Sequence, residues 1–194
     1  DEIRFGTVGK KLYNVDIRIA KDGEILAKGD NIMIGYYKNK EATDSCFDDK
    51  GWFHTGDLGY FDEESYLYFV DRKKDVIISG GMNIYPSDIE SALNKHFKVR
   101  ECATVGIHDP YLGEVPVIVV VCSEDVRIVE RELRSIAQQK LAASQRPMKY
   151  FFRDQLPQTS SGKVDKRSLR EELNGLNLDL SSKLRALQNA HGQT

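Results

Sequence analysis

A short stretch of the chain, LPQTSSGKVDKR at residues 156–167, places a lysine beside a glycine and among hydroxyl side chains. Such a group is suited to phosphate binding, because an ammonium group pairs with the anion and a glycine lets the backbone approach closely. A P-loop needs glycine at the position of Pro157 and Ser or Thr at that of Val164, so a P-loop is excluded. From these residues alone, Lys163 is either a nucleotide ligand of another design or a solvated surface lysine.

Two further stretches carry charged residues among glycines: GWFHTGDLGYFD at 51–62 and DRKKDVIISGGMNIYPSDIE at 71–90. The first contains Asp57, whose ionised carboxylate is a strong hydrogen-bond acceptor. An isolated aspartate of this kind usually caps a turn. The second stretch begins with five consecutive charges, which are typical of a solvated face, a linker or a domain boundary.

The elements that must position these residues change in character near residue 71. Before it, alternating apolar residues predict a hairpin of strands at 14–20 and 24–29, with further strands at 31–37 and 65–71. After it, the pattern mixes strands and helices. The predicted elements are a strand at 76–78, a loop at 79–83, a helix from Pro86 with Ile89, Ala92, Leu93 and Phe97 on one face, strands at 102–109, 114–122 and 149–154, a helix within 127–143 and a last helix capped by Asp165.

The composition describes a globular chain, since 40% of its 194 residues are hydrophobic and 30% are charged. A formal net charge of −2 gives no general attraction to nucleic acid or anionic membranes. The longest apolar run, at 115–122, is far shorter than the roughly 20 residues of a membrane helix, and no signal peptide is visible. Cys46, Cys102 and Cys122 are isolated, which predicts reduced thiols in a cytoplasmic protein and no metal site.

Taken in order, the three stretches resemble the C-terminal part of the adenylate-forming superfamily. This superfamily contains acyl-CoA synthetases, adenylation domains of peptide synthetases and beetle luciferases. The resemblance runs from about Phe5 to Leu173. It implies a reaction in which a carboxylate attacks the α-phosphate of Mg·ATP to give an acyl-adenylate and pyrophosphate. A thiol, usually that of coenzyme A, then displaces AMP.

The resemblance also implies roles for individual residues. Asp57 and Arg72 match the family's two contacts to the ribose of the nucleotide. Lys163 matches the lysine that bridges the substrate carboxylate and the phosphate during adenylation, where a cation offsets the repulsion of two anions. These three residues are the expected nucleotide and catalytic site.

The resemblance assigns two further features to the family's change of conformation. Lys74 matches the hinge residue about which the small C-terminal domain rotates between the two half-reactions. Ser79, Gly80 and Gly81 match the loop that lies beside the coenzyme A tunnel in the second conformation. A simple tight turn is the alternative for these three residues.

The expected fold class is α+β, with a small mixed sheet and flanking helices in a compact C-terminal domain. Residues 1–71 are predicted to be a β-rich remnant of the large ATP-binding domain and 72–75 the hinge. Residues 76–173 form the mobile C-terminal domain, and 174–194 a polar tail, partly helical or disordered. Ser65 occupies a position where the family usually has glycine, and a slightly different turn is expected there.

The sequence therefore predicts the C-terminal fragment of an AMP-forming acyl-CoA synthetase, with a fatty acid as the preferred substrate. The alternatives are an enzyme that loads a carrier protein and a non-catalytic interaction module. ATP, Mg²⁺ and coenzyme A are expected to be the substrates and cofactor of the full-length enzyme, and none is expected to bind tightly to the fragment. The fragment should be inactive without the missing N-terminal domain, and its exposed strand edges could pair in a dimer.

Overall fold

The structure is a computed structural model that describes residues 4–176. It divides into two compact units, Asp1–Lys74 (unit 1) and Asp75–Thr194 (unit 2). The division falls inside the predicted hinge at 72–75, where a short 3-10 helix spans Lys73–Asp75. Rotation at this point stays a prediction, and most of the tail predicted at 174–194 lies outside the described residues.

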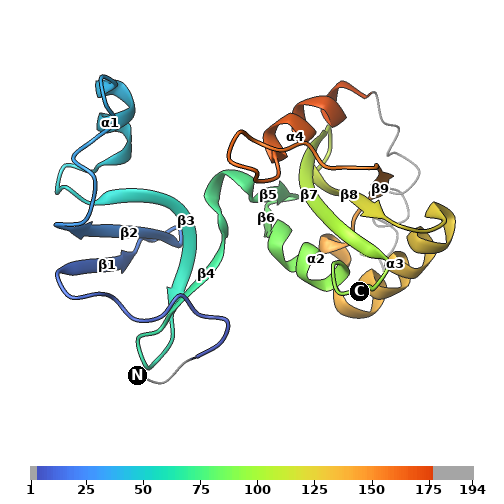
Figure 1. Cartoon of the computed structure of the whole chain (residues 1–194), viewed down its shortest axis with the longest axis horizontal. Helices are drawn as coiled ribbons and strands as arrows, with labels where there is room; N and C mark the ends of the chain where they lie inside the picture. Colours follow the sequence, from blue (N-terminus) through green and yellow to red (C-terminus); the bar gives the residue numbers. More distant parts are fainter. Residues whose placement is uncertain (1–3, 177–194) are drawn as a thin grey trace. The chain divides into compact units, whose positions relative to one another are not determined.

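Unit 1 is a four-stranded antiparallel sheet in which sequential strands are neighbours (Figure 1). The strands are β1 (Val15–Ile19), β2 (Glu24–Gly29), β3 (Phe53–Phe61) and β4 (Leu67–Arg72). A turn at Lys21–Gly23, closed by a hydrogen bond from the Gly23 amide to the Ala20 carbonyl at 3.0 Å, joins β1 and β2, which confirms the predicted hairpin. The small core of this unit consists of Ile25, Leu26, Ala27, Leu58 and Leu67.

The strand predicted at 31–37 is wrong. The chain turns after β2, where the Ile32 amide donates to the Gly29 carbonyl at 3.1 Å, and the following residues form no strand. Ile34 is fully exposed and Tyr37 is 87% exposed. β-branched and aromatic residues favour a strand only where a neighbouring strand and a buried face receive them. The sequence analysis also missed α1 (Lys40–Cys46), which begins where the Asn39 side chain accepts a hydrogen bond from the Ala42 amide at 3.0 Å.

Ser65 has the backbone conformation of a glycine, with φ of 65° in the turn between β3 and β4. A left-handed residue other than glycine costs roughly 1–2 kcal/mol, partly offset by the extra freedom that glycine has in the unfolded chain. We expect Ser65→Gly to stabilise unit 1 by about 0.5–1 kcal/mol in urea unfolding followed by the fluorescence of Trp52, the one tryptophan of the chain. Ser45→Gly, the same change within α1, is the control and should destabilise unit 1 by about 0.5 kcal/mol. Destabilisation by Ser65→Gly would contradict this account of the turn.

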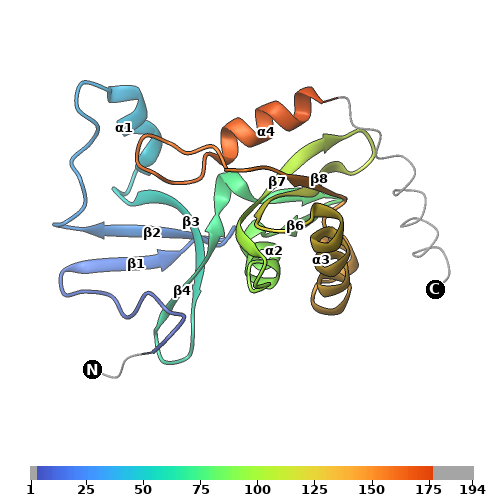
Figure 2. The same ribbon diagram turned by 45° about the vertical axis from the view of Figure 1, so that its right-hand side comes forward.

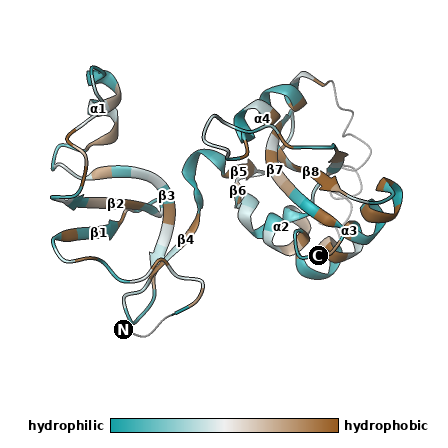
Figure 3. Ribbon diagram, in the orientation of Figure 1, coloured by the Kyte–Doolittle hydropathy of each residue, from teal (hydrophilic) through white to brown (hydrophobic). Residues whose placement is uncertain are grey.

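Unit 2 is a mixed sheet covered on both faces, which confirms the α+β fold class. The long antiparallel pair β7 (Val99–Asp109) and β8 (Gly113–Cys122) forms its centre. β8 also pairs with β5 (Ile77–Ser79), which forms a hairpin with β6 (Met82–Ile84), and in parallel with β9 (Lys149–Phe152). Figure 3 shows hydrophobic residues along β8, and residues Val115–Val121 of this strand are buried, as expected for a strand covered on both faces.

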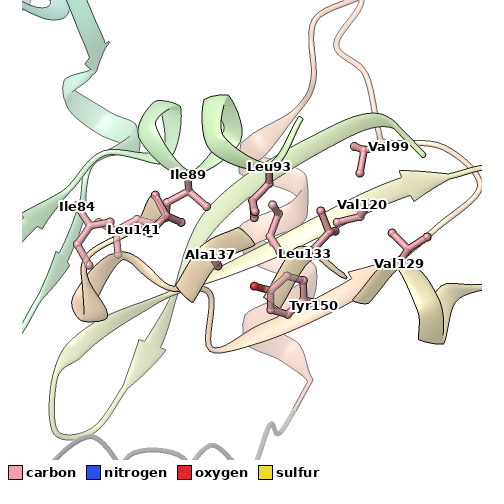
Figure 4. Packing of buried hydrophobic residues seen from close by; sticks show 12 residues of the cluster. Ile84, Ile89, Leu93, Val99, Val120, Val129, Leu133, Ala137, Leu141 and Tyr150 are labelled. Carbon is pink, nitrogen blue, oxygen red and sulfur yellow. The ribbon is translucent and has the colours of Figure 1, made fainter. Parts of the chain in front are cut away.

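Helices α2 (Pro86–Leu93) and α3 (Val126–Lys140) cover one face of this sheet, and α4 (Lys166–Gly175) covers the other (Figure 2). Alternate residues of β8 therefore enter two separate cores. Leu93, Leu133, Ala137 and Tyr150 meet on the α2–α3 side, as Figure 4 shows. On the other side Leu169 and Leu173 of α4 pack against the odd-numbered valines of β8.

Two details of the predicted unit 2 require correction. Phe97 does not share the apolar face of a helix, because α2 ends at Leu93 and the Phe97 side chain is 84% exposed. The predicted loop at 79–83 is largely strand, since Ser79 ends β5 and Met82 begins β6, and only Gly80 and Gly81 form the turn. The predicted cap of the last helix is confirmed, because Asp165 accepts a hydrogen bond from the Ser168 amide at 3.1 Å.

Candidate nucleotide and catalytic site

Strand pairing brings Asp57 and Arg72 together in unit 1. The two residues are direct partners in the register of β3 and β4. The Arg72 Nε atom lies 3.3 Å from Asp57 Oδ1, so the two side chains form an ion pair at the end of the sheet. The sequence analysis placed both residues in one site from the resemblance, and the register supplies the physical reason for their proximity.

The backbone around Asp57 departs from the regular ladder. Glu24 of β2 pairs with Leu58 and Leu26 pairs with His54. Between these two pairs β3 therefore contains two more residues than β2. The extra residues make a bulge, a feature that re-aims side chains at the edge of a site. Gly56 takes a φ of 73° within it, a left-handed conformation that favours glycine.

A pocket of 420 Å³ opens beside this bulge within unit 1. Its lining residues are Thr55, Gly56, Arg72, Lys73 and Lys74. Three of the five are cationic, and part of this positive charge is balanced within unit 1, because Arg72 pairs with Asp57 and Lys73 pairs with Glu24 and Asp22.

The Asp57 carboxylate has unused acceptor capacity. Its Oδ1 atom is buried and accepts no hydrogen bond within residues 4–176, since Arg72 Nε is near it but not aligned. The side chain as a whole is 31% exposed. Since Oδ1 is buried, a sugar diol would reach this carboxylate through the exposed part of the side chain, where its two hydroxyl groups would act as donors.

Sequence reasoning missed a buried carboxylate behind the bulge, that of Glu24. Burial alone would raise the pKa of this carboxyl, but hydrogen bonds from His54, from Lys73 and from the Gly56 amide together hold the pKa below its usual value. The ionised form therefore stabilises unit 1 above about pH 4.3, and this stabilisation is lost as the pH falls through the lowered pKa. The signal in the sequence was a charged residue directly before the apolar run Ile25–Ala27 of this strand.

Lys163 lies in unit 2, at the end of a small hairpin that precedes α4. The Lys163 carbonyl accepts hydrogen bonds from the Thr159 amide at 2.8 Å and the Thr159 hydroxyl at 3.2 Å. Leu156 is buried in the core and Val164 packs against that core, so both ends of the hairpin are anchored. The Lys163 side chain itself is exposed and makes no ion pair within the described part of the chain.

The Ser79-Gly80-Gly81 segment is a tight turn of the β5–β6 hairpin in unit 2. Gly80 and Gly81 have φ of 56° and 80°, so both require the left-handed conformation. The Gly80 amide donates to the Leu112 carbonyl at 2.8 Å, and Ser79 is buried. The backbone of this turn is therefore fixed from one side, and its role in ligand binding stays a prediction.

The remaining predictions concern metals, thiols and membranes. Among residues 4–176, no three His, Cys, Asp or Glu side chains are arranged to hold a metal ion. Cys46, Cys102 and Cys122 are free thiols, and burial raises the pKa of the Cys102 thiol to about 12. None of the helices described is long and apolar enough to cross a bilayer.

Comparison with known proteins places this chain in a family. Residues 88–163 match the family model of the AMP-binding enzyme C-terminal domain. The chain is 45% identical over 168 residues to the 2-succinylbenzoate–CoA ligase of Listeria monocytogenes serovar 1/2a, a match that covers 87% of this chain and 35% of the ligase. The chain thus spans about a third of the length of such curated relatives.

Two solved structures share the fold. The ATP-bound MatB from Rhodopseudomonas palustris matches with a TM-score of 0.80 and 36% identity, over 87% of this chain and 36% of MatB. The o-succinylbenzoate CoA synthetase from Bacillus subtilis, in complex with its acyl-adenylate intermediate, matches with a TM-score of 0.78 and 38% identity, over 88% of this chain and 36% of the synthetase. Residues 88–163 are therefore an AMP-binding enzyme C-terminal domain, and the chain belongs to the adenylate-forming enzyme family.

Proposed function

We propose that this chain works as the C-terminal part of an AMP-forming acid–CoA ligase. In the first step a carboxylate oxygen of the acid attacks the α-phosphorus of Mg·ATP, and the bond to the β-phosphate breaks to release pyrophosphate. In the second step the sulfur of coenzyme A attacks the acyl carbon, AMP leaves with the bonding electrons, and the thiol proton is lost. The observation that carries this proposal is the Asp57–Arg72 pair beside a pocket lined by Arg72, Lys73 and Lys74, in a chain of this family.

Each site residue has a physical role in the proposed reaction. Asp57 and Arg72 bind the ribose and so fix the nucleotide, which positions the α-phosphate for attack. Lys163 places a cation between the carboxylate and the phosphate, where negative charge gathers in the transition state. Asp57 and Arg72 belong to unit 1 and Lys163 to unit 2, so adenylation needs both units.

The proposal extends to the second step. Rotation about Lys74 would remove Lys163 from the reacting atoms and bring the Ser79-Gly80-Gly81 turn to the pantetheine arm of coenzyme A. The absence of side chains at Gly80 and Gly81 would let a thin ligand pass close to the backbone. Their left-handed conformation makes the turn specific for glycine.

The relatives support an aromatic acid as the substrate. The Listeria and Bacillus ligases carry the name of 2-succinylbenzoate, which favours this acid over the fatty acid expected from the sequence. We therefore propose that 2-succinylbenzoate or a closely similar aromatic acid is activated. The choice of acid follows from the names of these relatives.

The test uses the whole protein that contains this chain. We expect AMP release that depends on both ATP and coenzyme A with 2-succinylbenzoate, at a kcat/KM at least about 100-fold above that with anthranilate or a long-chain fatty acid. The products are separated by liquid chromatography and identified by mass. Turnover only with the fatty acid would restore the substrate expected from the sequence. Turnover only with a pantetheinylated carrier protein would identify a carrier-loading enzyme, and absence of AMP with every acid and acceptor would overturn the proposal.

A further inference from the structure

The Glu24 carboxylate contacts two residues that line the pocket, Gly56 and Lys73. Its side chain is only 5% exposed at the first position of β2. One carboxylate oxygen, Oε1, accepts a hydrogen bond from the Gly56 amide at 3.0 Å. The other, Oε2, contacts Lys73 Nζ at 2.9 Å and His54 Nδ1 at 3.0 Å.

The contact with Gly56 compensates for the bulge in β3. Because β3 leaves the ladder between His54 and Leu58, the Gly56 amide has no carbonyl of β2 opposite it. The Glu24 carboxylate takes the place of that carbonyl, and a buried amide without a partner would be costly. The Thr55 hydroxyl completes the bulge, since it donates to the Ile25 carbonyl at 2.7 Å and accepts from the Asp57 amide at 3.1 Å.

The contact with Lys73 fixes the second strand of the site. Lys73 follows Arg72 directly, and its ammonium group also pairs with Asp22 at 2.7 Å. The Glu24 carboxylate therefore contacts both Gly56, the residue before Asp57, and Lys73, the residue after Arg72. These two contacts restrain the backbone next to each member of the Asp57–Arg72 ion pair.

We propose that Glu24 is a positioning residue, which holds Asp57 and Arg72 in the geometry that binds the nucleotide. This inference rests on the proposed function, because it assumes that Asp57 and Arg72 bind ribose. Glu24 does not touch the nucleotide itself, so its whole effect passes through the bulge and through Lys73. A displacement of a binding group by about 1 Å is enough to weaken a site greatly.

The experiment measures ATP affinity by calorimetry on the whole protein. Glu24→Gln keeps the size of the side chain but removes the charge that holds Lys73 and His54. We expect the Kd for ATP to rise by about 10-fold, with the KM of the acid unchanged. Glu132→Gln is the matched control, because Glu132 also contacts a lysine and a histidine, Lys98 at 3.2 Å and His96 at 3.2 Å, but belongs to unit 2 and does not line the pocket. It should leave the Kd unchanged.

A double-mutant cycle separates positioning from general destabilisation. If Glu24 acts through Asp57, Glu24→Gln should weaken ATP binding by less than about 3-fold when Asp57→Asn is already present. Full additivity of the two losses, or an unchanged Kd in Glu24→Gln, would overturn the inference and leave the proposed function intact. Absence of ATP binding in the wild type would instead overturn the proposed function, and this inference with it. Should Glu24→Gln fail to fold, Glu24→Asp serves in its place, since it keeps the charge, shortens the reach by one methylene and should weaken binding by about 3-fold.

Discussion

Replacement of Lys163 by alanine in the whole protein is expected to slow acyl-adenylate formation by roughly 10²–10³-fold, or about 3–4 kcal/mol. The attack of a carboxylate on a phosphate brings two anions together, and a single cation between them offsets that repulsion most in the transition state. Lys163 suits this role because its hairpin holds the backbone while the side chain remains exposed and without an ion pair in the described part of the chain.

The measurement is a rapid-quench assay of acyl-adenylate, with acid and ATP supplied and coenzyme A omitted. Lys95→Ala serves as the control, since Lys95 is another exposed lysine of unit 2 that follows α2 and belongs to no part of the proposed site. It should retain the wild-type rate. A Lys163→Ala enzyme that forms the adenylate within threefold of the wild-type rate would show that Lys163 is only a surface lysine.

The second large effect is expected at Asp57. Hydrogen bonds from a sugar diol to a carboxylate are worth about 1.5–3 kcal/mol, so Asp57→Ala should weaken ATP binding by roughly 10–100-fold. The Asp57 side chain is 31% exposed, so a ligand can reach part of its carboxylate, while Oδ1 is buried beside Arg72.

A modified ligand makes the test of Asp57 specific. The wild type should bind 2′,3′-dideoxy-ATP about as weakly as Asp57→Ala binds ATP, and Asp57→Ala should not distinguish the two nucleotides. Asp16→Ala is the control, as Asp16 is an exposed aspartate of the same sheet that pairs with Lys11 at the surface. If Asp57→Ala still prefers ATP by the wild-type factor, Asp57 does not bind the ribose.

The main elements of unit 2 were predictable because burial dictates their pattern. A run of valines with no polar interruption indicates a strand covered on both faces, and β8 is such a strand. The helix at 127–143 followed from the spacing of its apolar residues, and α3 ends slightly earlier at Lys140. The start of the last helix could be predicted from one residue, because Asp165 caps its first turn.

Unit 1 was less predictable, because residue type there does not indicate whether a side chain is buried or whether it belongs to a strand. Ile34 and Tyr37 have strand propensity, yet no strand lies beside them and both are exposed. Conversely Glu24 is charged and buried, because its partners come from β3 and from Lys73, the first residue after β4. Those partners are 30 or more positions away in the chain, and pattern analysis along one segment cannot bring them together.

The thioester half-reaction of Lys163→Ala tests most directly whether the site residues of the two units act in alternation. The variant is supplied with purified acyl-adenylate and coenzyme A, and acyl-CoA is measured over time. Because Lys163 should have left the reacting atoms by this step, the account predicts a rate within about threefold of the wild type, against a loss of roughly 10²–10³-fold in adenylation. Equal damage to both half-reactions would contradict the account and make Lys163 a residue that supports the domain as a whole.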